Sequence, residues 1–221
     1  MSRPAPAGGM RQRRAPRSNP LSFQKDPRGR RERVLSAAEQ LFARSGYGGV
    51  TTAQIASAAG VAEGNVFHYF GSKQKLLCEV GARWGRGFAA AMFEGARPRA
   101  GRDVIETMVR RAFAYVESSH AGFGLFLLSS DPALGREVYL ANRRAVTSAV
   151  ENAIVQWSHL RLVRVGNPGI VANLLFGLVE AALRACFVEG DGEGPPASRQ
   201  AVAAYRDEVV TAIVRILEID A

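Results

Sequence analysis

The sequence has few of the residues from which disulfide, metal or catalytic sites are built. Its two cysteines, Cys78 and Cys186, lie far apart and show no Cys-x-x-Cys spacing. Its three histidines, His68, His120 and His159, are scattered, and no nucleophile-elbow or phosphate-loop pattern occurs. We therefore expect no disulfide framework, no metal, no cofactor and no catalytic activity.

Long apolar runs are also missing. No stretch of 18 apolar residues occurs, and the basic N-terminus lacks the apolar core of a signal peptide. We therefore expect a protein that neither spans a membrane nor is exported, and that works in the reducing cytoplasm in association with the nucleoid. Strand patterns are absent too, so the 47% of hydrophobic residues predict an all-α fold.

Acidic residues are absent from the first 25 positions, where six basic residues lie. This segment supplies +6 of the formal net charge of +9. Its Pro, Gly and Arg residues show no periodicity, so we predict that residues 1–27 form a disordered basic arm. Such an arm either strengthens DNA binding by releasing counterions from phosphates or is a solvated extension.

Residues 51–76 contain two short helical patterns separated by a glycine. Thr51 and Gln54 fit a capping box at the start of the first helix, and Gly60 fits the left-handed position at its end. A second helix is predicted from Glu63 to Phe70. Two short helices joined by a Gly-containing turn form a helix-turn-helix, whose second helix enters the major groove of DNA.

The second helix of this pair has one apolar and one polar side. We assign its inner face to Val66, Phe67 and Phe70. Outward-pointing Asn, His and Tyr side chains offer hydrogen bonds and flat surface to base edges, and Gly allows close approach of the backbone. The residues that we expect to point outward are Gly64, Asn65, His68 and Tyr69.

The run that follows Arg33 and ends at Leu77 resembles the N-terminal domain of TetR-family transcriptional regulators. The matching features, in order, are AAEQLFARSGY, TT, IA..AGV, G.(V/L)(F/Y).(Y/H)F and SK..L, over about a fifth of the chain. The resemblance implies a three-helix DNA-binding domain, which we place at residues 28–75. Ala62 departs from the residues favoured as an N-cap, and Glu63 is expected to turn aside from DNA or to cap. The resemblance further implies phosphate contacts from Thr51, Thr52, Gln54 and Lys73.

The remainder of the chain predicts a larger helical domain, which we place at residues 76–221. A long helix over about 73–93 connects it to the first domain. The glycines of this helix fit either a compliant connector or close packing against a neighbouring helix. They are Gly81, Gly85 and Gly87.

The pattern over residues 170–188 is apolar around most of its circumference, so this helix is predicted to be buried on all sides. In so small a domain, a second subunit is the expected cover. The resemblance implies the same, because in TetR-like proteins the last two long helices pair with their two-fold mates as a four-helix bundle. We therefore expect a homodimer on a palindromic double-stranded DNA operator.

Large side chains in the second domain suggest a ligand pocket, although any one of them is more often plain core. TetR-like proteins often hold an inducer between the corresponding helices, which implies a small apolar or amphipathic ligand. The residues that we assign to this pocket are Trp84, Phe88, Met92, Phe113, Phe123, Phe126, Tyr139 and Trp157.

Together these patterns predict a ligand-responsive transcriptional regulator that represses by occupying its operator. Two alternatives stay open. One is a small-molecule binding protein whose DNA-binding domain is vestigial, and the other is a non-specific nucleoid binder driven by the arginine-rich arm.

Overall fold

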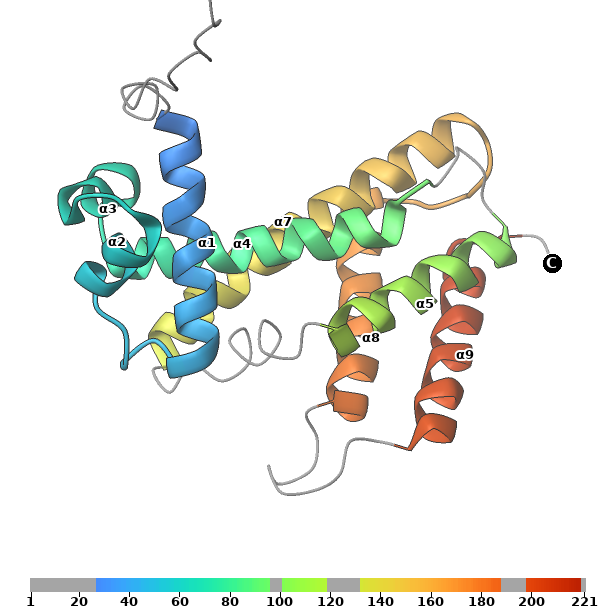
Figure 1. The fold of residues 1–221 in the computed structure, drawn as a ribbon. Coiled ribbons are helices and arrows are strands. Elements are labelled where there is room, and N and C mark those ends of the chain that lie inside the picture. Colours follow the sequence, from blue (N-terminus) through green and yellow to red (C-terminus); the bar gives the residue numbers. More distant parts are fainter. Residues whose placement is uncertain (1–26, 96–100, 119–131, 188–197, 220–221) are drawn as a thin grey trace, which may run out of the picture.

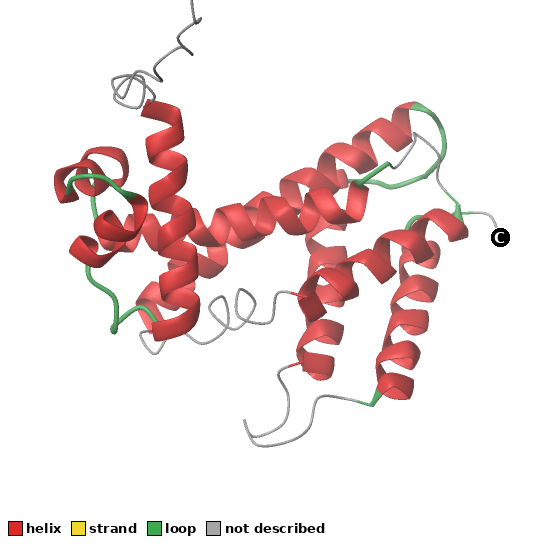
Figure 2. Ribbon diagram, in the orientation of Figure 1, coloured by secondary structure: helices red, strands yellow, loops and turns green. Residues whose placement is uncertain are grey.

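The computed structural model describes residues 27–95, 101–118, 132–187 and 198–219, and all regular structure in these ranges is helical (Figure 1, Figure 2). The predicted all-α fold is confirmed. The predicted arm and the pocket residues Phe123 and Phe126 lie outside the described residues. The described helices are α1 (Pro27–Ser45), α2 (Thr52–Ala59), α3 (Glu63–Phe70), α4 (Lys73–Phe93), α5 (Arg102–Ser118), α7 (Pro132–His159), α8 (Pro168–Phe187) and α9 (Arg199–Ile216).

Helices α1, α2 and α3 gather at one end of the molecule and form a unit that we call the head (Figure 1). Its core forms because apolar residues of α1 recur at helical spacing and pack on α2. α4 and α7 extend this core past residue 75, so the proposed domain boundary there stays a prediction. The buried core includes Val34, Ala38, Phe42, Ile55, Ala59, Val66, Phe70, Leu76, Leu77, Val80 and Val138.

Ion pairs fasten α1 across α4. Arg83 of α4 lies 2.8 Å from Glu32 and 3.4 Å from Glu39 of α1. Arg31 of α1 lies 2.9 Å from Glu79 of α4. Each pair is partly exposed and contributes at most about 1 kcal/mol, so the shared apolar core provides most of the attachment.

The glycines of α4 lie where α7 packs along it. A Cβ atom on Gly81 would lie 2.7 Å from Cγ1 of Val138, and one on Gly85 would lie 2.8 Å from the backbone oxygen of Asn142. Both distances are too short for a side chain. The structure therefore supports close packing, the second of the two interpretations of these glycines. Gly87 packs in the same way, against the hydroxyl group of Tyr115 from α5.

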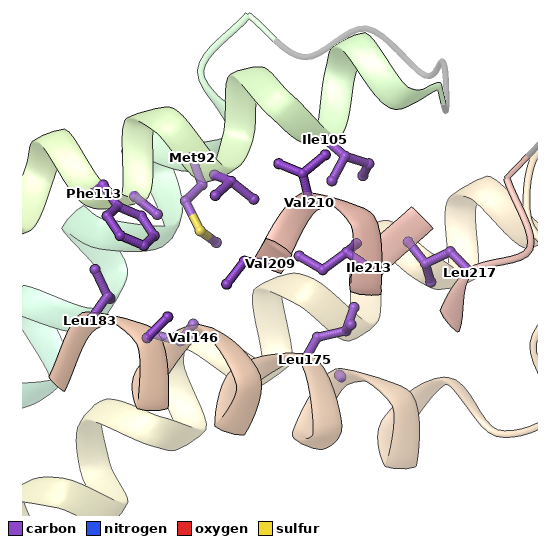
Figure 3. Packing of buried hydrophobic residues seen from close by; sticks show 14 of the residues in the cluster. Met92, Ile105, Phe113, Val146, Leu175, Leu183, Val209, Val210, Ile213 and Leu217 are labelled. Atoms are coloured by element: carbon purple, nitrogen blue, oxygen red, sulfur yellow. The ribbon is translucent and has the colours of Figure 1, made fainter. Parts of the chain in front are cut away.

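Helices α5, α8 and α9, with the remaining lengths of α4 and α7, enclose a second core that we call the body. Figure 3 shows side chains from all five helices converging on it. Met92 of α4, Ile105 of α5 and Val146 of α7 meet Leu175 of α8 and Ile213 of α9. The body therefore depends on residues from most of the length of the chain after residue 76.

Within a single chain α8 is covered on one side only, so the prediction that a second subunit completes its burial stays a prediction. Ala172, Leu175 and Leu183 are buried, whereas Ile170 and Leu174 are 61% and 60% exposed. By length and composition alone α8 could cross a membrane, and only 28% of its apolar window is buried. Its outer face therefore lacks a cover within the described chain.

Candidate nucleic-acid interface

Local hydrogen bonds set the ends of α2. The backbone N–H of Gln54 donates to Oγ1 of Thr51 (3.2 Å), and the N–H of Thr51 donates to Oε1 of Gln54 (2.8 Å). These two bonds form the predicted capping box. Gly60 ends the helix with φ 64°, in the left-handed region that favours glycine. The N–H of Val61 then donates to the carbonyl of Ala56 (3.0 Å), which closes the turn into α3.

α3 corrects the predicted assignment of its two faces. Val66 and Phe70 are buried as expected, but Phe67 is 48% exposed and Tyr69 is partly buried against the core of the head. At about 100° per residue, positions 67 and 69 lie at equal angles on either side of the buried pair 66 and 70. The sequence pattern therefore does not distinguish them, and the packing of α3 on the rest of the head buries the side of Tyr69.

Gly64, Phe67 and His68 of α3 and Gly71 directly after its end are exposed and form one stripe at i, i+3, i+4 and i+7, and Glu63 is exposed at the helix start. This outward stripe points away from the core of the head and combines two small positions with an aromatic ring and an imidazole. Of the predicted base-contacting residues, Gly64 and His68 belong to it, while Asn65 and Tyr69 lie at its margin and are partly buried. The outward stripe consists of Gly64, Phe67, His68 and Gly71.

The threonines predicted to bind phosphate surround the start of α2. Thr51 and Gln54 are exposed, and their side chains belong to the capping box. The hydroxyl of Thr52 donates to the carboxylate of Glu63 (2.5 Å). This bond ties the start of α2 to the first turn of α3 and turns Glu63 aside, as expected.

Lys73 opens α4 beside the head. Its Nζ lies 4.0 Å from the centroid of the Tyr47 ring, a cation–π arrangement, and partial burial lowers the pKa of its ammonium group. Ser72 caps the helix by accepting from the N–H of Lys75 (3.1 Å). Lys73 therefore carries its charge at a helix start, where backbone amides also favour anions.

A polar hollow between α1 and α3 contains functional candidates that the sequence did not reveal. Arg30 and Arg33 line it together with residues 59–62 and Asn65. Nε of Arg33 donates to the carbonyl of Ala59 (3.1 Å), which holds this side chain in place. Two guanidinium groups beside Asn65 favour an anion such as a DNA phosphate. The signal in the sequence is RGRRER at the start of α1, but an arginine run does not show which residues face α3.

The N-terminus of α3 adds to this preference for anions. Its N-cap residue, Ala62, makes no side-chain hydrogen bond, and it lines the same hollow. The free amides of the first turn and the helix dipole therefore add positive potential next to Arg30 and Arg33. The departure of Ala62 from the favoured capping residues is confirmed.

The body contains an apolar cavity of about 80 Å³ between α4, α5, α7, α8 and α9. Four of the predicted pocket residues line it, and its two polar lining residues are Asn142 and Glu180. The rings of Trp84 and Phe88 stack with centroids 5.4 Å apart and form one wall. The four predicted residues on the cavity are Trp84, Phe88, Met92 and Trp157.

Two other predicted pocket residues lie away from this cavity. Phe113 is buried in the core with its ring centroid 6.3 Å from that of Phe187. Tyr139 donates its hydroxyl to Oε2 of Glu180 (3.0 Å), and its pKa is raised by burial and by this carboxylate. Within the described part of the chain, no three His, Cys, Asp or Glu side chains gather closely enough to hold a metal ion.

Residues 34–80 run from α1 through the first third of α4 and match a family model described as bacterial regulatory proteins, tetR family. Over this segment the chain resembles TetR-family regulators. Within the matched segment, α2, its turn and α3 form the predicted helix-turn-helix.

A curated relative matches over a longer stretch. KstR2 from Rhodococcus jostii, an HTH-type transcriptional repressor, is 30% identical over 103 residues, which are 44% of this chain and 48% of KstR2. The match thus spans about half the length of that TetR-like repressor.

Solved structures show the TetR fold over most of the chain. A protein from Mesorhizobium loti assigned to the TetR family has a TM-score of 0.63 at 20% identity, over 86% of this chain and 98% of that one. FadR from Bacillus subtilis, in complex with stearoyl-CoA, has a TM-score of 0.59 at 18% identity, over 84% of this chain and 98% of FadR. At these identities the likeness concerns the fold alone.

Proposed function

We propose that this chain is a ligand-responsive transcriptional repressor that binds a palindromic operator as a homodimer. The observation that carries the proposal is the outward stripe of α3, on a helix whose other side is buried in the head. The family model supports DNA as the partner, and the name of KstR2 supports repression as the outcome.

We propose that different residues of the head contact the bases and the phosphates of DNA. Phe67 packs its ring against thymine methyl groups, and His68 hydrogen-bonds base edges. Arg30 and Arg33 bind a phosphate beside the start of α3, and Lys73 binds one at the start of α4. The phosphate contacts fix the position of α3 in the major groove, and the outward stripe selects the sequence.

A second copy of the chain is the proposed cover for α8. Ile170 and Leu174 expose most of their apolar surface on this helix, and Tyr205 and Ile216 are 44% and 37% exposed on α9. Pairing of these helices about a two-fold axis buries such surface in both copies. The dimer then presents two α3 helices to two half-sites with dyad symmetry.

The proposed ligand site is the cavity of the body. A ligand releases the operator only if it binds more tightly to the form of the dimer that does not fit DNA, because equal affinity for both forms shifts nothing. α4 and α7 provide the connection, since both contribute to the core of the head and to the body.

Selection of bound sequences from random double-stranded DNA tests the proposed function. We expect a pool enriched in one dyad-symmetric site, and a footprint that covers both half-sites. A pool without enrichment, or an enriched site without dyad symmetry, would contradict the repressor model.

The same experiment separates the two alternatives. A non-specific nucleoid binder loses its affinity when residues 1–25 are deleted, whereas an operator-specific dimer still selects its site without the arm. A small-molecule binding protein with a vestigial DNA-binding domain selects no site with or without the arm.

A further inference from the structure

Asn142 of α7 is the one buried polar or charged side chain among the residues that the structure describes, with 1% of its surface exposed. Its Nδ2 donates to the carbonyl of Gly81 over a long 3.4 Å. Oδ1 has no hydrogen-bond donor within the described chain, although the side chain lines the cavity of the body. This oxygen can therefore accept a hydrogen bond from a ligand in the cavity.

The rest of the cavity wall is apolar. Of its 21 lining residues, 19 are apolar, and the remaining two are Asn142 and Glu180. The carboxylate of Glu180 already accepts from Tyr139 (3.0 Å) and Arg184 (3.2 Å). Among the two side chains of the wall that carry an oxygen acceptor, Asn142 is therefore the one whose oxygen is left to accept from a ligand.

Charge on the ligand is disfavoured by the same wall. Among the described residues, neither Lys nor Arg lines the cavity. An anion in this space lies near the carboxylate of Glu180, and Arg184, the cation beside that carboxylate, is already paired with it (3.2 Å). Moving an ionised group from water into such surroundings is costly unless it is paired.

The size of the cavity sets a second limit. At about 80 Å³ it is smaller than a cavity of about 150 Å³ that holds benzene. A ligand of one or two rings must already move the walls apart, and a larger molecule must move them further.

We propose that the cavity binds a compact, uncharged, mostly hydrocarbon ligand with one hydrogen-bond donor, which Oδ1 of Asn142 accepts. The inference rests on the proposed function for its role as the inducer site, and it names the chemical class of that inducer. This class differs from stearoyl-CoA, the molecule in the FadR structure, because a coenzyme A thioester carries several phosphate charges.

Benzene, phenol and benzoate at neutral pH test this class, because they share one ring and differ in a single substituent. Binding to the full chain without DNA is measured by calorimetry. The emission of Trp84 and Trp157, which are the two tryptophans of the chain and both line the cavity, locates the site. We expect phenol and benzene to bind and to change this emission, and benzoate to bind at least about tenfold more weakly than benzene.

The variant Asn142→Leu tests the hydrogen bond. We expect the preference for phenol over benzene, expressed as the ratio of their dissociation constants, to fall about tenfold in this variant. The control is Asn152→Leu on the same helix, where the asparagine is exposed and lies off the cavity, and it should leave the ratio unchanged. Asn142→Ala gives the same comparison if leucine prevents folding, as judged by helical circular dichroism.

Three outcomes overturn the inference. They are tightest binding of benzoate, an unchanged ratio in both Asn142 variants, and the absence of tryptophan emission changes with all three probes. Because these measurements contain no DNA, they are independent of the operator selection. If the selection yields no operator, the proposed function is contradicted, but the inferred class of ligand is not.

Discussion

Phe67 combines a large apolar side chain with 48% exposure on the helix that we propose enters DNA. We expect Phe67→Ala to lower the affinity for the selected operator about fivefold to tenfold, because the ring no longer packs against the groove. The free energy of unfolding should change by less than about 0.5 kcal/mol, since the ring leaves no cavity in the core. Fluorescence anisotropy and thermal denaturation measure the two quantities.

Val66 is the matched control, because it is the neighbouring residue and is fully buried. Val66→Ala should lose about 2 kcal/mol of stability through the cavity that it creates. If Phe67→Ala destabilises the protein as much as Val66→Ala does, or leaves operator affinity unchanged, Phe67 is not a DNA contact.

Arg33 gives a second prediction for single residues, through the salt dependence of binding. Arg33→Gln removes one cation from the polar hollow, so the slope of log affinity against log salt should become shallower by about 0.9 for each subunit. Arg33→Lys retains the charge and should keep the slope. Titrations at four or five salt concentrations provide the measurement, and equal slopes for both variants would exclude a phosphate contact.

For single residues, the sequence predicts the role of a side chain when that role depends only on nearby backbone groups. Thr51, Gln54 and Gly60 were predicted correctly because a cap or a left-handed turn involves neighbours within three or four residues. The inner and outer assignments of Phe67 and Tyr69 were interchanged, because both residues are aromatic and both lie within one turn of the buried positions 66 and 70. Arg30 and Arg33 required the packing of α1 on α3 before their faces were known.

Among the helices, α4 and α7 have the closest contact, with backbone against backbone at Gly81 and Gly85. In an isolated helix Gly85→Ala stabilises by about 1 kcal/mol. Here the added Cβ would lie 2.8 Å from the backbone oxygen of Asn142, which cannot rotate away. We expect a net loss of about 1–3 kcal/mol in the free energy of unfolding, measured by denaturant titration.

The control for α4 is Gly64→Ala on α3, where a Cβ atom meets nothing within 4 Å. This change should leave stability unchanged or raise it slightly. A Gly85→Ala variant that is as stable as the parent would show that α4 is free to move away from α7.

The sequence predicted which segments are helical but left the role of the α4 glycines undecided. Period and capping residues suffice for the first task, because they belong to one helix at a time. Whether a glycine loosens a helix or admits a neighbour depends on what lies opposite. For Gly81 that neighbour is Val138, which is 57 positions away in the chain.

In the whole molecule, the outer face of α8 determines the state of association. We expect the double variant Ile170→Glu and Leu174→Glu to be monomeric, because two charges on each copy oppose burial of this face. Light scattering after size exclusion measures the mass, and operator affinity should fall with dimer formation. Leu160→Glu is the control, since Leu160 is 52% exposed near the end of α7 and should leave the mass unchanged. A parent chain that is already monomeric would remove the basis for a palindromic operator.

The apolar pattern around α8 shows why the oligomeric state is harder to predict from the sequence than the fold. An apolar pattern predicts that a surface is covered, but it contains no information on whether the same chain or another copy covers it. One chain buries α8 on one side only, and the exposed positions of Ile170 and Leu174 indicate where a second copy would bind.

The arrangement of the body has a consequence for how regulators of this kind diversify. α5, α8 and α9 pack on one another and on α4 and α7, and they supply much of the cavity wall without forming the head. Under the proposed function, duplicated genes can acquire a response to a new molecule through changes in these three helices and keep the same operator. For an engineered biosensor, libraries confined to the cavity-facing positions of α5 and α9 should change the signal detected and leave the reporter DNA unchanged.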